Sequence, residues 1–256
     1  MNHASPESPV SSSSSERSLS LLALVAAEGR ALSLADVAAR LALPKATAHR
    51  LCGQLLEGGW LLRDADERSF SVGPALRRLA IDTLNNGVVG GLRHAVLAEL
   101  VERVGETCNF TTLDGAEVLY LDRVEARRPW RLTLDVGAHV PLHCTASGKL
   151  FLASMAPARR DALIDGLHLE AMTPTTITSP EALRAECAAI AERGWSTDRE
   201  EFIAGLNAAA VPVRDEHGRT RAAIAVHAPS ARMSIDDAIA RLPALKAAAA
   251  RMAALL

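Results

Sequence analysis

Apolar residues recur at helical spacing three times in the N-terminal quarter of the chain. The i, i+3, i+4, i+7 pattern of an amphipathic helix is met by Leu19, Leu22, Ala23 and Ala26, by Leu34, Val37, Ala38 and Leu41, and by Ala48, Leu51, Cys52 and Leu55. Ser33 with Asp36 predicts a capping box for the second helix, and Pro44 fits the first position of the third. The pattern predicts three short helices around a small core, with a tight turn at Ala42 and Leu43.

Two β-prone runs follow, at residues 60–63 and 69–72, on either side of the polar segment 64–67. They predict a β-hairpin, and three helices followed by a hairpin predict a winged helix-turn-helix domain over residues 18–73. A further helix is predicted from Pro74 to Leu84. Asn85-Asn86-Gly87 and Gly90-Gly91 mark a domain boundary, so residues 74–91 are interpreted as a linker helix.

Residues 92–256 mix helical and strand patterns. Strands are predicted over 108–113, 118–124, 131–134, 206–213 and 221–227. Helices are predicted over 92–104, near Thr145, near Ala158, over 180–192 behind the cap Ser179, and behind the capping box of Ser234 and Asp237. Pro243 should kink or break the last of these helices. Strands that arrive as hairpins, with helices before, between and after them, favour an α+β fold with an antiparallel sheet and flanking helices.

Composition sets broad limits on this picture. A chain of 256 residues with 49% hydrophobic content can form two ordinary domains with real cores. The Ser-rich residues 1–17 hold too little apolar surface to fold, and we expect them to be disordered. No stretch approaches the ~18 apolar residues of a membrane helix, and the N-terminus does not resemble a signal peptide, so we expect a cytoplasmic protein without membrane contact.

The cysteines and charges narrow the class further. Cys52, Cys108, Cys144 and Cys187 lie far apart without paired spacing, which predicts reduced thiols and no metal site. Residues 17–80 carry nine Lys and Arg against six Asp and Glu, although the net charge of the whole chain is −2. The asymmetry fits a DNA-binding N-terminal domain.

The third predicted helix presents a small, polar and cationic face. With its apolar stripe turned inward, a rotation of ~100° per residue places Ala46, Arg50 and Gly53 outward. Arg50 and Thr47 are suited to base edges or phosphates, and Arg63 and Arg68 of the hairpin to neighbouring phosphates. The predicted DNA-binding residues are Lys45, Ala46, Thr47, His49, Arg50, Gln54 and Arg68. The alternative is a charged helix that only solvates the surface.

Three segments resemble the IclR-type bacterial transcriptional regulators. They are Leu43-Pro44-Lys45-Ala46-Thr47-Ala48-His49-Arg50-Leu51, the run 140–153 around Thr145-Ala146-Ser147-Gly148-Lys149, and the run 194–202 around Asp198. The resemblance spans residues 18 to about 250. It implies a winged DNA-binding domain, a linker helix and a GAF-like effector-binding domain over residues 92–256.

The resemblance also implies partners. Members are typically homodimers or homotetramers that bind palindromic operators on double-stranded DNA, as repressors, activators or both. A two-fold dimer presents two recognition helices to spaced half-sites. No cofactor is implied, and the sequence leaves open the effector, the operator and the sign of regulation.

A small organic acid is the expected effector. The predicted start of a helix at Ala146, Ser147 and Gly148 offers free amides to a carboxylate. Asp198, Asn207 and His227 supply polar groups, and by resemblance Ala208 and Ala225 also occupy effector-contact positions, with Asn109 on the first strand added. The complete predicted effector set is Asn109, Ala146, Ser147, Gly148, Asp198, Asn207, Ala208, Ala225 and His227.

The chain departs from the family pattern at three positions. Ala46 stands where Ser is common, Ala208 where Cys or Ser is frequent, and His227 where Ser is usual. The last two imply an effector that differs from the simplest keto acids, possible classes being aromatic or hydroxylated acids.

Two other function classes were weighed. An enzyme would use Asp198, His227 or Cys144 on a small acid, but the sequence assembles no nucleophile, base and orienting group, so no catalytic residue is predicted. An interaction module would use the helix-turn-helix only for dimerisation.

Overall fold

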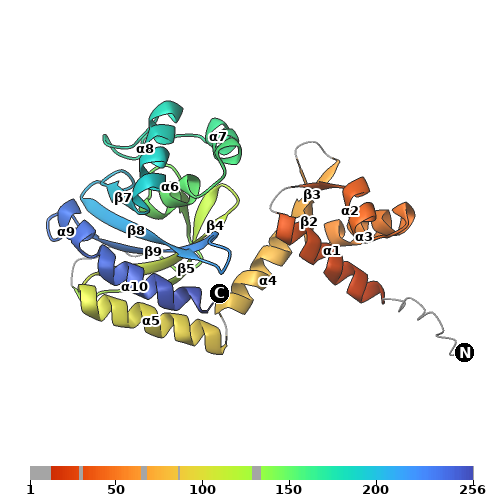
Figure 1. Ribbon diagram of the computed structural model, residues 1–256, viewed down its shortest axis with the longest axis horizontal. Helices are drawn as coiled ribbons and strands as arrows, with labels where there is room; N and C mark the ends of the chain where they lie inside the picture. The colour runs from red at the N-terminus through yellow and green to blue at the C-terminus, as the bar shows by residue number, and fades with distance from the viewer. Residues whose placement is uncertain (1–12, 29–30, 65–67, 86, 129–133, 256) are drawn as a thin grey trace, which may run out of the picture. The chain divides into compact units, whose positions relative to one another are not determined.

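The computed structural model describes residues 13–28, 31–64, 68–85, 87–128 and 134–255. The chain divides into two compact units, Met1–Thr83 and Leu84–Leu256 (Figure 1). Of the predicted disordered tail, residues 1–12 lie outside the described part. Helix α1 (Ser14–Glu28) already includes residues 14–17, because Ser13 and Glu16 form an unpredicted capping pair, with backbone-to-side-chain distances of 2.7 and 3.2 Å.

The N-terminal unit has the predicted winged helix-turn-helix architecture. After α1 it runs through β1 (Leu32–Ser33), α2 (Leu34–Arg40), α3 (Lys45–Glu57), β2 (Leu61–Arg63), β3 (Ser69–Val72) and α4 (Pro74–Asn85). The predicted capping box of Ser33 and Asp36 is confirmed. Strand β1 was not predicted, since two residues are too few to show alternation; it pairs with β3 in a sheet of order β1-β3-β2.

The turn between α2 and α3 is fixed by backbone geometry. Ala42 adopts a left-handed φ of 50°, and the Leu43 N–H donates to the Ala38 carbonyl at 2.9 Å. The buried residues of α3, β2 and β3 then pack on α1 in a single core. Ala48, Leu51, Cys52 and Leu55 face this core as the sequence predicts, which turns the opposite side of α3 outward.

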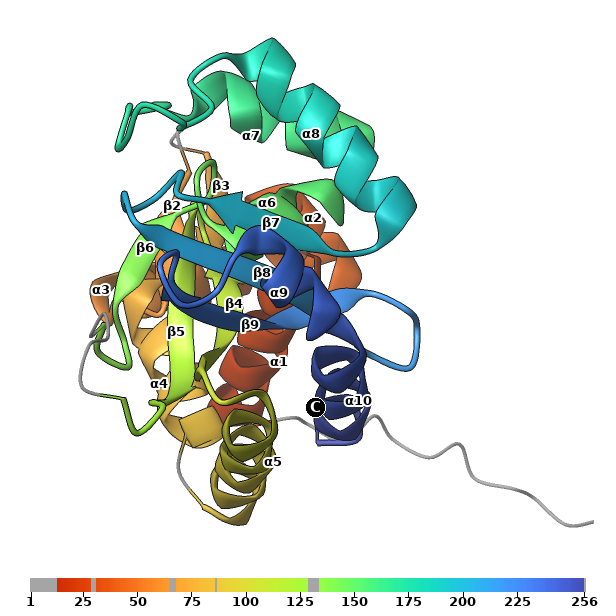
Figure 2. The ribbon, with the colours of Figure 1, turned by 90° about the vertical axis from the view of Figure 1, so that its left-hand side faces the viewer.

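The C-terminal unit is an antiparallel sheet between two helical layers. Its elements are α5 (Val88–Val104), β4 (Thr107–Asp114), β5 (Glu117–Val124), β6 (His139–Pro141), α6 (Ala146–Ala153), α7 (Pro157–Gly166), α8 (Pro180–Arg193), β7 (Ser196–Arg199), β8 (Leu206–Arg214), β9 (Thr220–Pro229), α9 (Ile235–Ala240) and α10 (Leu242–Ala253). The strand order is β6-β5-β4-β9-β8-β7. Helices α5 and α10 cover one face, and α6 and α8 lie over the other (Figures 1 and 2).

Most of the predicted elements of this unit are confirmed. Ser179 caps α8, Ser234 and Asp237 form their capping box, and the last helix breaks so that Pro243 lies in the first turn of α10. Strands β6 and β7 are not among the predicted strands. Of the strand predicted over 131–134, residues 131–133 lie outside the described part.

Of the two glycine-containing segments predicted to mark the boundary, the helices break at Gly87 of the first and not at Gly90-Gly91. Both glycines belong to the first turns of α5, and the chain breaks at Gly87, whose φ is 90°. Gly90 is buried, and a Cβ at Gly91 would meet nothing within 4 Å. Adjacent glycines predict a helix break, whereas here they lie within a helix that buries Val96, Leu97 and Leu100 further along.

Two kinds of feature are absent from the described residues. Within them, no helix combines the length and apolar character needed to cross a bilayer. Nor do three or more His, Cys, Asp or Glu side chains gather there as metal ligands would.

The capping box of α2 gives a stability prediction for the helix-turn-helix. Ser33→Ala leaves an unpaired amide at the start of α2. The free energy for local opening of this helix should therefore fall by about 1 kcal/mol. Amide hydrogen exchange of α2 and α3 measures the loss. Ser20→Ala, at an exposed position of α1, is the control and should change nothing; equal exchange rates in both variants would contradict this account of the cap.

Candidate functional site

The outward face of α3 carries most of the predicted DNA-binding residues. Lys45, Ala46, His49, Arg50 and Gln54 are exposed, and Thr47 is half-buried. Arg50 Nη1 donates to Gln54 Oε1 at 3.1 Å, so one side-chain pair already spans a turn of the helix. The face therefore combines small residues, which allow close approach to a groove, with cationic and amide groups that can contact bases.

The hairpin adds two exposed arginines to the same unit. Arg63 lies with its guanidinium 5.6 Å from the centre of the Phe70 ring, and Arg68 is exposed at the start of the second strand. Phe70 is itself buried in the core of the unit, so the wing is anchored on the helices by the residue that Arg63 covers.

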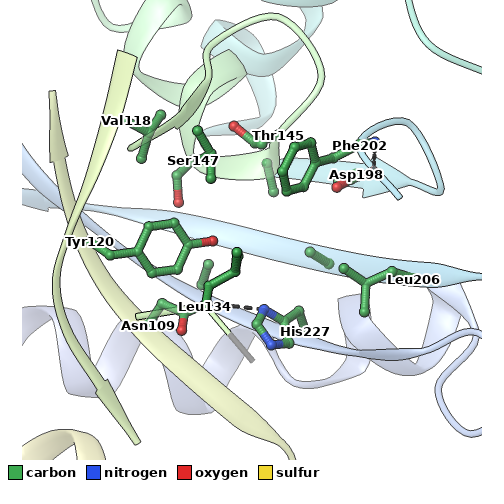
Figure 3. Close-up of a pocket in the computed structure, with 14 residues that line it drawn as sticks. Asn109, Val118, Tyr120, Leu134, Thr145, Ser147, Asp198, Phe202, Leu206 and His227 are labelled. Atoms are coloured by element: carbon green, nitrogen blue, oxygen red, sulfur yellow. Dashed lines mark hydrogen bonds between the residues drawn. The ribbon is translucent and has the colours of Figure 1, made fainter. Parts of the chain in front are cut away.

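A second candidate site is a cavity between α6 and the sheet of the C-terminal unit. The space between its walls is about 390 Å³ when the open solvent at its mouth is included. Figure 3 shows Ser147 on one side and Asn109 and His227 on the other, with the Tyr120 hydroxyl between them. The lining residues are Asn109, Val118, Tyr120, Leu134, Val140, Thr145, Ala146, Ser147, Asp198, Phe202, Leu206, Ala208, Ala225 and His227.

The start of α6 forms one wall of the cavity. Thr145 caps the helix: its Oγ1 accepts from the Gly148 N–H at 3.1 Å and donates to the Pro141 carbonyl at 2.7 Å. The amides of Ala146 and Ser147 are left without an intrahelical carbonyl. The helix therefore presents backbone donors, the Ser147 hydroxyl and a partial positive charge to the cavity.

Gly148 supports this wall without lining the cavity. A Cβ at Gly148 would lie 2.3 Å from the Leu142 carbonyl oxygen and 2.5 Å from the Leu142 Cα. Only glycine therefore allows the segment before α6 to pack on the first turn of the helix.

The opposite wall holds a chain of three hydrogen-bonded side chains. Arg123 Nη1 donates to Asn109 Oδ1 at 3.1 Å, and Asn109 Nδ2 lies 3.0 Å from His227 Nδ1. All three side chains are buried. Burial, with a smaller contribution from the Arg123 charge, lowers the pKa of His227 to about 3, so its ring is neutral at physiological pH.

Asp198 is the acid of the cavity. One carboxylate oxygen, Oδ1, accepts from the Glu201 N–H at 2.7 Å. Burial is the largest influence on this carboxyl, and its pKa rises to about 7. The same cause raises the pKa of Tyr120 to about 12. Near neutral pH, Asp198 therefore exchanges a proton readily while Tyr120 stays protonated.

A buried ion pair holds the Asp198 loop against α6. Lys149 Nζ contacts Glu201 Oε1, and both side chains are almost fully buried. Glu201 Oε1 also accepts from the Arg199 N–H at 3.3 Å. Because the Glu201 N–H bonds to Asp198, this pair connects the helix start to the acid of the cavity.

The structure brings together seven of the predicted effector residues and leaves two apart. Gly148 packs behind the wall, and the Asn207 amide donates to the Met233 carbonyl at 3.0 Å instead of facing the cavity. Adjacent strand residues alternate in direction, so Asn207 cannot share the cavity with its neighbours Leu206 and Ala208. The seven are Asn109, Ala146, Ser147, Asp198, Ala208, Ala225 and His227.

Sequence reasoning missed several lining residues. Tyr120 is the chain's one tyrosine and lies on a predicted strand, which was the available signal. Thr145 was predicted only as a helix start. Leu134 ends a predicted strand and Phe202 ends the run 194–202 that resembles the family, but neither pattern indicates that the side chain lines the cavity.

The neighbouring cysteine shows no sign of activation. Burial raises the pKa of Cys144 to about 12, so its thiol is protonated and a poor nucleophile. His143 Nε2 lies 2.9 Å from the Glu170 carbonyl oxygen, where it donates a hydrogen bond, and is engaged away from the thiol.

Comparison with known proteins gives a consistent result over the whole chain. The C-terminal domain model of IclR bacterial transcriptional regulators matches residues 84–254, and the IclR helix-turn-helix model matches residues 14–65. The probable transcriptional regulator SauR of Cupriavidus necator is 42% identical over 94% of this chain and 96% of its own length.

Solved structures of related regulators are similar to this chain over nearly its whole length. A putative transcriptional regulator from Rhodococcus sp. RHA1 has a TM-score of 0.65 at 28% identity, covering 95% of this chain and 97% of that one. An IclR homolog from Microbacterium hydrocarbonoxydans, complexed with 4-hydroxybenzoate, has a TM-score of 0.59 at 27% identity, covering 95% and 99%.

The close approach at Gly148 gives a prediction for the cavity wall. Gly148→Ala forces a methyl group into the Leu142 backbone and should lower the free energy of unfolding by about 1–3 kcal/mol. Denaturant unfolding of the full chain measures it. Gly166→Ala is the control, because Gly166 lies at the exposed end of α7 and its added Cβ would meet no atom within 4 Å; it should leave the free energy of unfolding unchanged. An unchanged free energy of unfolding in Gly148→Ala would contradict the close contact between Gly148 and Leu142.

Proposed function

The chain belongs to the IclR family of bacterial transcriptional regulators, and on that premise we propose that it binds operator DNA through α3 and the wing under the control of a small organic acid held in the cavity. One observation supports the part of the proposal that concerns the effector. The first turn of α6 has free backbone N–H donors, and its residues Ala146 and Ser147 line the cavity.

The DNA half rests on the exposed face of α3. Arg50 is the longest cationic side chain at the middle of that face, and Thr47 lies one turn before it. Ala46 offers only a methyl group, so we propose that Arg50 and Thr47 read most of the base edges. We assign contacts with phosphates or adjacent bases to Lys45, His49, Gln54 and Arg68.

We further propose that the chain works as a homodimer or homotetramer on a palindromic operator. One winged unit reads only a few base pairs, and two units related by a two-fold axis reach the affinity and specificity of a bacterial operator. Such a protein works where the bacterial chromosome is, in the cytoplasm.

The cavity suits a small acid for electrostatic reasons. The amides of Ala146 and Ser147 favour a carboxylate through both hydrogen bonds and the helix dipole. The homolog from Microbacterium hydrocarbonoxydans binds 4-hydroxybenzoate, which supports an acid of this size for the present chain.

The DNA proposal is tested by a mobility shift on the intergenic DNA upstream of the chain's own gene. Arg50→Ala should weaken specific binding at least about tenfold, since one bidentate base contact is worth ~1–3 kcal/mol. Arg159→Ala, which removes an exposed arginine of α7 in the other unit, should bind as the unsubstituted chain does. Equal binding by both variants, or binding insensitive to salt, would refute the proposed reading face.

The effector proposal predicts a pH dependence. A bound carboxylate adds negative charge beside Asp198 and favours its protonated form, so binding takes up a proton. Affinity should be highest below pH 7 and fall by up to about tenfold per unit above it, as Asp198, with a pKa of about 7, ionises.

Calorimetric titration of acetate, butyrate and benzoate from pH 6 to 9 measures this slope, because all three acids are almost fully ionised in this range. Asp198→Asn should flatten the slope, whereas Asp236→Asn, an exposed carboxylate of α9, should keep it. A slope retained in Asp198→Asn would contradict the assignment of the proton to Asp198.

A further inference from the structure

The orientation of the Asn109 amide is determined by its neighbours. Arg123 can only donate, so the atom of Asn109 that it contacts at 3.1 Å must be the carbonyl oxygen. The amide NH2 therefore faces His227 and donates to Nδ1 at 3.0 Å. Because Nδ1 accepts this bond, the neutral ring carries its proton on Nε2.

The second nitrogen of His227 has no partner. Nε2 is buried, and none of the described residues offers it a hydrogen-bond acceptor. Buried donors in native proteins are almost always paired, and an unpaired one costs roughly 1–3 kcal/mol. His227 borders the cavity, so a bound molecule is the natural source of the missing acceptor.

The hydrogen-bonded chain from Arg123 through Asn109 strengthens the Nε2–H donor of His227. Each hydrogen bond in a chain polarises the next, so the Arg123 charge makes Asn109 a better donor and, through it, draws electron density from the His227 ring. The charge itself stays behind Asn109. No Lys or Arg is among the described residues that line the cavity. The positive charge of Arg123 therefore polarises the cavity wall only through the hydrogen bonds of Asn109 and His227.

We propose that Arg123, Asn109 and His227 act as a relay that holds the Nε2–H of His227 as a neutral donor, and that this donor selects acids carrying a second oxygen acceptor. The inference rests on the proposed function, in which the first acid group binds at the start of α6. Ser147 and His227 lie on opposite walls (Figure 3), so a two-ended acid spans the cavity. His227 is the contacting residue, and Asn109 and Arg123 are positioning residues.

The class of effector follows from the donors. One end is a carboxylate or a similar acid group at the amides of Ala146 and Ser147. The other end is a carbonyl, a hydroxyl or a second acid group that accepts from His227. Asp198 lies on the same side of the sheet as His227. When it is ionised, its carboxylate can accept a hydrogen bond from a hydroxyl of the bound molecule.

Matched pairs of acids test the selection. The full-length chain is titrated calorimetrically with succinate and butyrate, malonate and propionate, and 4-hydroxybenzoate and benzoate, which differ only in the second oxygen-bearing group. In at least one pair the two-ended acid should bind about tenfold more tightly. His227→Phe should reduce this ratio to about one, whereas His217→Gln, an exposed histidine of the β8–β9 turn, should retain it.

The tautomer gives an independent readout, whose first measurement is made on the unsubstituted chain. Nitrogen-15 NMR of the histidine rings should find the His227 proton on Nε2, and Asn109→Leu should release that preference. A proton on Nδ1, or a charged ring at neutral pH, overturns the relay.

The outcomes separate the two proposals. If none of the six acids binds, the organic-acid effector and the relay both fail. If acids bind with ratios near one in every pair, or if His227→Phe keeps the ratio, only the selection by His227 is overturned.

Discussion

Strand register in the six-stranded sheet is the constraint on which the cavity depends. Asp198, Ala208 and His227 lie opposite one another across β7, β8 and β9, and Asn109 lies opposite both Ala225 and Arg123. A slip of one residue would turn each of these side chains to the other face. The register is held by the helices on both faces, since each face of the sheet buries apolar residues against its own layer.

A bulge between β4 and β5 completes the polar wall. Thr111 pairs with Tyr120 and Asn109 with Arg123, so one extra residue on β5 lies between them. Without it, Tyr120 and Arg123 would point to opposite faces; with it, the tyrosine lines the cavity and the arginine supports Asn109. The small side chains of Ala208 and Ala225 leave the space that these polar groups surround. The cavity is thus a product of pairing geometry as much as of the residues themselves.

Local patterns were sufficient to predict most elements of the fold, and the site only in part. Helical periodicity and caps at Ser33, Ser179 and Ser234 are local signals, and α2, α8 and α9 followed from them. The core face of α3 was likewise predictable from spacing. The Arg123–Asn109–His227 chain was not, because it joins three strands through a bulge that no single segment reveals. Asn207 was assigned to the cavity from its residue type, although strand alternation places it on the other face. Strand β1 and the helical glycines of α5 were also not predictable from local patterns, because tertiary packing determines the conformation of both segments.

The central claim is that an acid in the cavity and DNA on α3 influence one another. The most direct measurement is the dissociation constant of the full chain for its operator at fixed salt, with and without a saturating concentration of the acid that binds most tightly, together with the affinity for that acid with and without operator. Linkage requires both affinities to change by the same factor, which is about 5–150-fold in typical allosteric proteins. We expect matching factors in that range. An acid that binds the chain while leaving operator affinity unchanged would contradict the account.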